Sequence, residues 1–178
     1  MHTNHLPKGR RAKMKAHITN GTYNFLVKIQ SDHPDIPIYL MQAGDSTLAY
    51  YEGKKSSVFE QARDYESFVA DGELQQSGFV VMNNIPVTYE GKPIFEDQFK
   101  RRAGSMNDIP GFQALRVLRP LQGNKYVVMV QWNSRESYQN WKDSDAFAAA
   151  HSSSKSKKRP PYHAGPSYTT EANMIEPT

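Results

Sequence analysis

Three residues in the second half of the chain have types and spacing that could do chemistry: Asn83, Trp141 and His151. The alternation of residues 79–87 places Asn83 in the middle of one otherwise apolar strand face. Such an amide either satisfies a neighbouring backbone group or donates a hydrogen bond into a pocket. The sequence leaves both roles open for Asn83.

His151 ends an amphipathic helical pattern, which distinguishes it from the other five histidines. The alanines at 148–150 precede it, and Phe147 lies one turn back. Small side chains beside an imidazole leave room for a broad, flat group, and Phe147 offers that group an apolar wall. The alternative is a structural histidine that interacts with the helix dipole.

Trp141 lies ten positions before His151. On one continuous helix this spacing turns the two side chains roughly 80° apart, so both can border a pocket that lies across the helix. The alternative is a core tryptophan that only packs. Together, the three residues could supply a metal ligand, a hydrogen-bond donor and a large flat packing surface.

The elements that must position these residues follow the order β-α-β-β-α-β. Pro93 suits the first position of one helix. A capping box from Asn133 to Glu136 indicates the start of a second helix, which is expected to reach His151. The expected strands are 79–88, 112–119, 126–132 and 167–174. This order predicts an α+β fold with a ferredoxin-like antiparallel sheet.

The first half is less informative. A strand at 15–19 and a helix from Asn20-Gly21-Thr22 to His33 precede short strands at 37–42, 47–52 and 56–60, and a short amphipathic piece at 65–69 closes the half. Three segments are predicted: a disordered extension at 1–13, an N-terminal α+β half at 14–75 and the ferredoxin-like domain at 76–178. The first boundary is placed at Met14 because that residue resembles a translation start.

Charge and composition narrow the function classes. The chain has 178 residues, a net charge of +4 and no cysteine, which excludes thiolate chemistry and is consistent with a reducing cytoplasm. The basicity is confined to residues 1–15 and 151–163, with five and four cations and no acid, so the remainder is mildly acidic. We therefore expect no nucleic-acid partner. No apolar run approaches the length of a membrane span.

The chain resembles the haem-degrading members of the antibiotic-biosynthesis-monooxygenase superfamily, including the staphylococcal iron-regulated surface determinant enzymes. It looks closest to the two-part bacillary members, which carry an extra N-terminal half. The matching stretches are 79–87, 110–120 and 141–151, and the Trp-x₂-Ser-Asp-x-Phe-x₃-His string at 141–151 is the most specific. The resemblance covers most of 76–175 and, for the two-part members, extends back to about residue 14.

The resemblance implies that Asn83, Trp141 and His151 are the catalytic residues and that Phe147 joins them in binding haem. His151 would ligate the iron, Asn83 would donate a hydrogen bond on the open side where O₂ binds, and Trp141 would distort the porphyrin. Haem would be both substrate and cofactor, and electrons would come from an external donor, since the sequence has no nucleotide fingerprint. Family members are typically dimers with a shared barrel. Here the N-terminal half could replace the partner in a pseudo-dimeric barrel, which favours a monomer over a homodimer.

Three other functions remain open at this stage. A haem-binding protein without turnover would keep His151 but have no need for Trp141, and a cofactor-free oxygenase of an aromatic substrate would need no iron ligand. A stress or signalling protein would use the fold for contacts alone. Staphylococcal signalling relatives share the two-part layout but lack the full triad, which this chain keeps.

Overall fold

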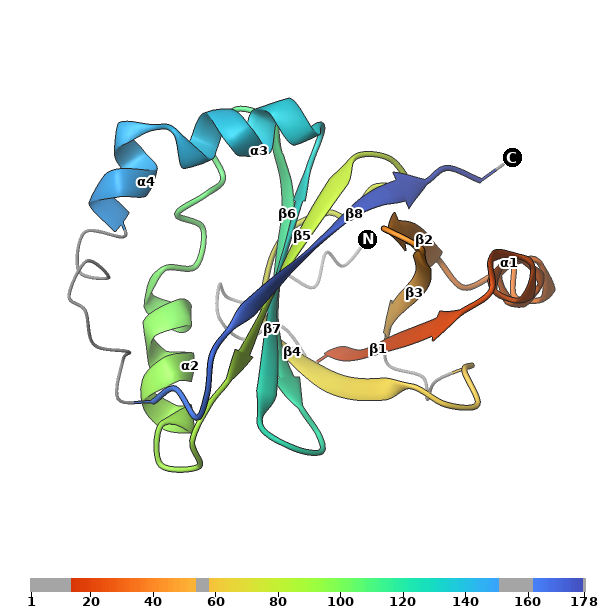
Figure 1. Cartoon of the computed structure of the whole chain (residues 1–178), viewed down its shortest axis with the longest axis horizontal. Helices are drawn as coiled ribbons and strands as arrows, with labels where there is room; N and C mark the ends of the chain where they lie inside the picture. Colours follow the sequence, from red (N-terminus) through yellow and green to blue (C-terminus); the bar gives the residue numbers. More distant parts are fainter. Residues whose placement is uncertain (1–13, 54–57, 151–161, 178) are drawn as a thin grey trace, which may run out of the picture.

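The computed structural model describes residues 14–53, 58–150 and 162–177 (Figure 1). Within these ranges eight strands and four helices follow one another in the order β-α-β-β-β, then β-α-β-β-α-α-β. The strands are β1 (Met14–Gly21), β2 (Ile38–Ala43), β3 (Ser46–Gly53), β4 (Arg63–Gly72), β5 (Phe79–Pro86), β6 (Phe112–Pro120), β7 (Lys125–Trp132) and β8 (Tyr168–Ile175). The helices are α1 (Tyr23–Asp32), α2 (Lys92–Arg101), α3 (Arg135–Lys142) and α4 (Asp145–Ala150).

The strands close into a barrel in the order β1-β3-β2-β8-β5-β7-β6-β4, and every neighbouring pair is antiparallel. Starting from the fourth strand of each half, β4-β1-β3-β2 and β8-β5-β7-β6 have the same arrangement, that of the ferredoxin-like sheet. The predicted fold class is confirmed, as is the expectation that the first half completes a pseudo-dimeric barrel.

The two halves join at two junctions of unequal length. β4 pairs with β6 over seven residue pairs, with a register shift between Ser67 and Val69. β2 pairs with β8 over three pairs, from Leu40–Ile175 to Gln42–Asn173.

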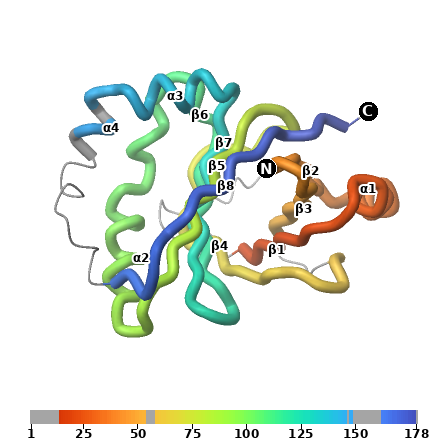
Figure 2. Tube along the Cα trace, viewed as in Figure 1, coloured from red at the N-terminus to blue at the C-terminus, as the bar shows by residue number. Residues whose placement is uncertain are grey.

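Alternation along the strands separates the barrel interior from its outer faces. Inward side chains from both halves form one apolar cluster that includes Ile18, Tyr50, Met82 and Met129. On the outside, α2 and the α3–α4 pair cover the same side of the β5–β8 strands, whereas α1 lies against the first half (Figures 1 and 2).

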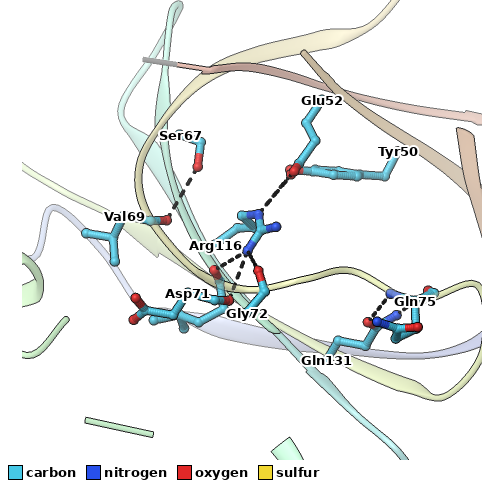
Figure 3. Close-up of polar contacts among 10 residues, drawn as sticks. Tyr50, Glu52, Ser67, Val69, Asp71, Gly72, Gln75, Arg116 and Gln131 are labelled. Carbon is cyan, nitrogen blue, oxygen red and sulfur yellow. Dashed lines mark hydrogen bonds and ion pairs between the residues drawn. The ribbon is translucent and has the colours of Figure 1, made fainter. Parts of the chain in front are cut away.

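A buried ion pair ties the halves together inside the barrel (Figure 3). Arg116 of β6 donates from Nε to Glu52 of β3 at 2.9 Å, and its Nη1 donates to the carbonyl oxygens of Asp71, Gly72 and Leu115. Tyr50 also donates to Glu52, at 2.6 Å. Because these bonds satisfy the carboxylate and much of the guanidinium, the pair can lie in the interior without leaving an unpaired charge.

The amphipathic piece expected at 65–69 is the middle of strand β4, where buried and half-buried residues alternate. Three other expectations about local structure were wrong. Residues 58–60 of the expected strand 56–60 form bends, whereas 56 and 57 lie outside the described residues. Ser134, not Asn133, caps α3. The helix expected to run unbroken to His151 ends at Lys142, and α4 begins at Asp145. Within the described ranges, no helix is both long and apolar enough to cross a membrane.

Candidate functional site

Asn83 projects from the outer face of β5, between α2 and the α3–α4 pair. It is exposed, whereas the outward residues before and after it, Val81 and Ile85, are only 8% and 6% exposed. Its backbone neighbours across the sheet are Val128 of β7 and Thr169 of β8. The sequence prediction of a lone amide on an apolar face is therefore confirmed, and the amide is open to a ligand.

Apolar side chains surround this amide on the same face. One cluster lies toward α3 and contains Phe79, Val81, Trp132 and Tyr138. A second lies toward α2 and includes Ile85, Leu115, Val128 and Phe95. Phe112 and Val130 pack against both clusters, so the apolar surface is continuous from one helix to the other. A flat apolar molecule laid on this face would meet one polar group, Asn83, within that surface.

Trp141 is half-buried at the α3 side of this face. Its ring lies 5.3 Å from that of Trp132 and 6.5 Å from that of Tyr138, centroid to centroid. Phe147 of α4 meets Trp141 edge-on, with centroids 4.8 Å apart and planes at 81°. This aromatic group forms a wall rather than part of the deep core, because Trp141 and Phe147 both keep solvent-accessible surface.

The break between α3 and α4 has a local cause at Ser144. Its backbone N–H donates to the carbonyl of Trp141 at 3.0 Å, and its hydroxyl accepts from the N–H of Phe147 at 3.2 Å. Ser144 therefore closes one helix and caps the next. Because the helix is interrupted here, the rotation argument that related Trp141 to His151 does not hold, although Trp141 and Phe147 still meet.

The start of α3 is fixed against the sheet. Ser134 accepts a hydrogen bond from the N–H of Ser137 at 3.1 Å, and Asn133 accepts one from the hydroxyl of Ser137 at 2.6 Å. Gly111 has a φ of +84°, and a Cβ on it would come within 2.4 Å of the Ser137 side chain. A glycine is therefore required where the chain entering β6 passes α3.

On the other side of the face, a polar cluster fastens α2 to the sheet. Glu96 accepts hydrogen bonds from Arg119 and from Tyr126, and Arg119 also donates to Glu66 at 2.9 Å. Burial alone would raise the pKa of Glu96, but the hydrogen bonds from Arg119 and Tyr126 outweigh it and lower the pKa. Burial and the bond to Glu96 raise the pKa of Tyr126. Sequence reasoning missed this cluster, because its hydrogen-bonded partners are 23 to 53 residues apart in the sequence.

The structure brings together three of the four residues expected at the site: Asn83, Trp141 and Phe147 belong to one outer face. His151 lies outside the described residues, directly after α4, and its role remains a prediction. The face offers an amide donor, an aromatic wall and an apolar floor, which suits a large, flat, mostly apolar ligand.

These features describe an α+β barrel protein with a candidate ligand-binding face on the helix-covered side of its second half. Residues 78–153 match the model of the family "Antibiotic biosynthesis monooxygenase". The match covers most of the second half of the chain, which is therefore similar to this family in the region that carries Asn83 and Trp141.

Two kinds of relative align over both halves. A "Heme-degrading monooxygenase" of Listeria monocytogenes is 25% identical over 130 residues, which cover 73% of this chain and 78% of the relative. A "Signal transduction protein TRAP" of Staphylococcus aureus is 27% identical over 133 residues, 75% of this chain and 80% of the relative.

Solved structures show that the whole two-half barrel is a shared fold. The structure of a major regulator of staphylococcal pathogenesis superposes with a TM-score of 0.80 at 24% identity, covering 91% of this chain and 99% of the other. LmHde, a heme-degrading enzyme from Listeria monocytogenes, superposes with a TM-score of 0.70 at 22% identity, covering 92% and 99%.

Proposed function

We propose that this protein is a haem-degrading monooxygenase, which binds haem and opens the porphyrin oxidatively with O₂ and electrons from an external donor. The observation that carries the proposal is the exposed amide of Asn83 between buried Val81 and Ile85 on the helix-covered face. The Listeria relative named "Heme-degrading monooxygenase" supports the same class of activity.

The described residues fit a porphyrin. The side chains between α2 and α3 are apolar and aromatic, which suits contact with the flat, largely apolar faces of a macrocycle. The chemistry of the donor set also fits, because an amide can donate a hydrogen bond where charge develops during oxygen activation. When bound, haem supplies the iron and the redox chemistry, so it is at once substrate and cofactor.

Each residue then has a distinct task. The amide of Asn83 would donate a hydrogen bond to the group bound above it. Trp141, which packs against Trp132 and Phe147, would contact one face of the macrocycle. His151 is proposed as the iron ligand, supplied from the segment that follows α4.

The decisive experiment adds haemin to the purified protein and then ascorbate as the reductant. We expect a Soret band that saturates at one haem per chain, followed by its loss as the porphyrin is opened. A stable Soret band under reducing conditions would mean haem binding without turnover. Failure to develop a Soret shift would remove haem from the function altogether and favour a cofactor-free oxygenase.

A second candidate, a signalling protein that uses the fold for contacts, is favoured by one finding. The Staphylococcus aureus relatives named "Signal transduction protein TRAP" match this chain at 26% or 27% identity over 75% of its length. This candidate predicts that neither haem binding nor ascorbate-dependent bleaching occurs, so the haemin experiment separates the two functions.

A further inference from the structure

One mouth of the barrel holds a cavity of about 480 Å³, within the usual range for small-molecule sites. Its walls are the strand ends that meet at this mouth, from the last residues of β1 and β5 to the first residues of β4, β7 and β8. The side chains that line it point into the barrel, so the cavity is separated by the sheet from the face that carries Asn83.

The cavity floor is apolar and its rim is polar. Ile18, Leu48, Met82 and Val127 of the interior cluster form the floor, and all four are at most 5% exposed. Exposed Arg63, Lys125 and Tyr168 lie at the rim. Hydrogen bonds order both cations: Arg63 donates to Asn20 at 2.9 Å, and Lys125 donates to the hydroxyl of Tyr168 at 3.0 Å.

Among the residues that the structure describes, neither rim cation is paired with a carboxylate. The residues that line the cavity include no acid, and within the described ranges neither Arg63 nor Lys125 forms an ion pair. Arg116, further inside the same barrel, is by contrast paired with Glu52. An apolar hollow with two ordered and uncompensated cations at its rim is complementary to an amphipathic anion.

We propose that the barrel mouth is a second binding site, for a small aromatic carboxylate or a similar amphipathic anion. The anionic head binds Arg63 and Lys125, and the apolar body lies on the floor formed by Ile18, Leu48, Met82 and Val127. Asn84, whose amide donates to Tyr168 O and Thr170 Oγ1 at 3.2 Å, holds β5 to β8 at the wall of this site. The cavity lies on the other side of the sheet from Asn83, because Asn83 and Asn84 project from opposite faces of β5.

The test uses 2-naphthoate and its neutral counterpart 2-naphthamide, each titrated by calorimetry into the haem-free protein. We expect the acid to bind at least about tenfold more tightly, as loss of a charge-assisted contact predicts. The double variant Arg63→Gln, Lys125→Met should remove this preference. The matched control Lys28→Met, Arg101→Gln removes two exposed cations elsewhere and should preserve it.

Further variants locate the site. Ala43→Phe places a ring into the cavity and should block the acid without lowering the melting temperature by more than a few degrees. Asn83→Ala should leave naphthoate binding unchanged. Equal affinity for acid and amide, full binding by the Arg63 and Lys125 double variant, or loss of binding in Asn83→Ala would each overturn the proposal.

Discussion

The two halves of the barrel have the same strand order, but the outward polar residue at one equivalent position is buried in the first half and exposed in the second. On the first strand of each half, an outward polar residue pairs with the second residue of the fourth strand: His17 with Asp64, and Asn83 with Thr169. His17 is 3% exposed, lies 2.6 Å from the Asp64 carboxylate and stacks on Tyr51. Asn83 is exposed.

The same strand order therefore does not by itself produce a ligand-accessible polar residue. In the second half, α3 and α4 follow the third strand and carry an aromatic wall over the face of Asn83. In the first half the corresponding described residues, 58–61, form bends, and Phe59 packs in the cluster with Tyr51. One half thus uses its polar residue to complete a packed face, whereas the other leaves it open to a ligand.

Replacing one histidine in each half, His151 in the second and His17 in the first, should give the largest contrast. His151→Ala should weaken haem binding by more than the roughly 10–100-fold that outer partners of metal ligands contribute, because the iron loses its protein ligand. A haemin titration that follows the Soret position measures this effect.

His17→Ala is the matched control in the first half. It should leave the Soret band unchanged and lower stability by about 1–3 kcal/mol, because it removes a buried hydrogen-bonded ring from Asp64. An unaltered haem titration in His151→Ala would end the ligand assignment.

Adjacent amides on β5 sharpen the comparison between the outer and inner faces. Asn83→Ala should retain haem but slow its degradation by about a hundredfold, as expected when a hydrogen-bond donor to the reacting oxygen is lost. Single-turnover bleaching with ascorbate measures the rate. Asn84→Ala, on the inner face, should cost stability but keep the rate. If Asn83→Ala bleaches haem as fast as the wild type, the amide is structural.

A smaller effect is expected for Trp141→Phe. The smaller ring should relax the macrocycle and slow turnover several-fold, while haem affinity is retained and stability falls by ~1 kcal/mol. Resonance Raman spectra report the planarity of the bound porphyrin alongside the bleaching assay. A flattened porphyrin that is degraded at the normal rate would contradict the distortion role.

The smallest effect on haem chemistry is expected for Glu96→Gln, which loosens α2. The pKa of Glu96 is lowered in the folded protein, so its stabilising contribution is present above the unfolded pKa, near about 4.3, and is lost as pH falls through the folded value. Thermal unfolding at neutral pH should show a loss of about 1–3 kcal/mol. This difference should shrink between about pH 5 and pH 3, and a constant difference would mean that the carboxylate charge is irrelevant.

Much of the fold was predictable, because strand alternation and turn residues are local signals. Alternation in 79–87 correctly placed Asn83 on one strand face with Val81 and Ile85, and the β-α-β-β-α-β order was confirmed. The predicted helix boundaries were wrong where more than one side chain could cap the helix or interrupt its backbone hydrogen bonds. Ser134 rather than Asn133 took the cap of α3, and Ser144 interrupted a helix that apolar spacing predicted to be continuous.

Contacts between distant residues could not be predicted from spacing. Glu96, Arg119 and Tyr126 come from a helix and two strands, and nothing in their local sequence marks them as partners. The barrel-mouth cavity likewise exists only once the strands of both halves have closed around it. The predicted roles of Asn83, Trp141 and His151 rest on the resemblance and await the experiments above.

Closure of the barrel also bears on aggregation. A four-stranded ferredoxin-like sheet has two edge strands, whose free backbone groups can pair with another chain. Here the edge strands of one half, β2 and β4, are covered by those of the other, β8 and β6. The β2–β8 junction has three residue pairs and the β4–β6 junction seven, so local opening at β2–β8 requires the fewest broken backbone bonds. We therefore expect that heating and high concentration first expose free strand edges at this short junction, near Met41 and Met174.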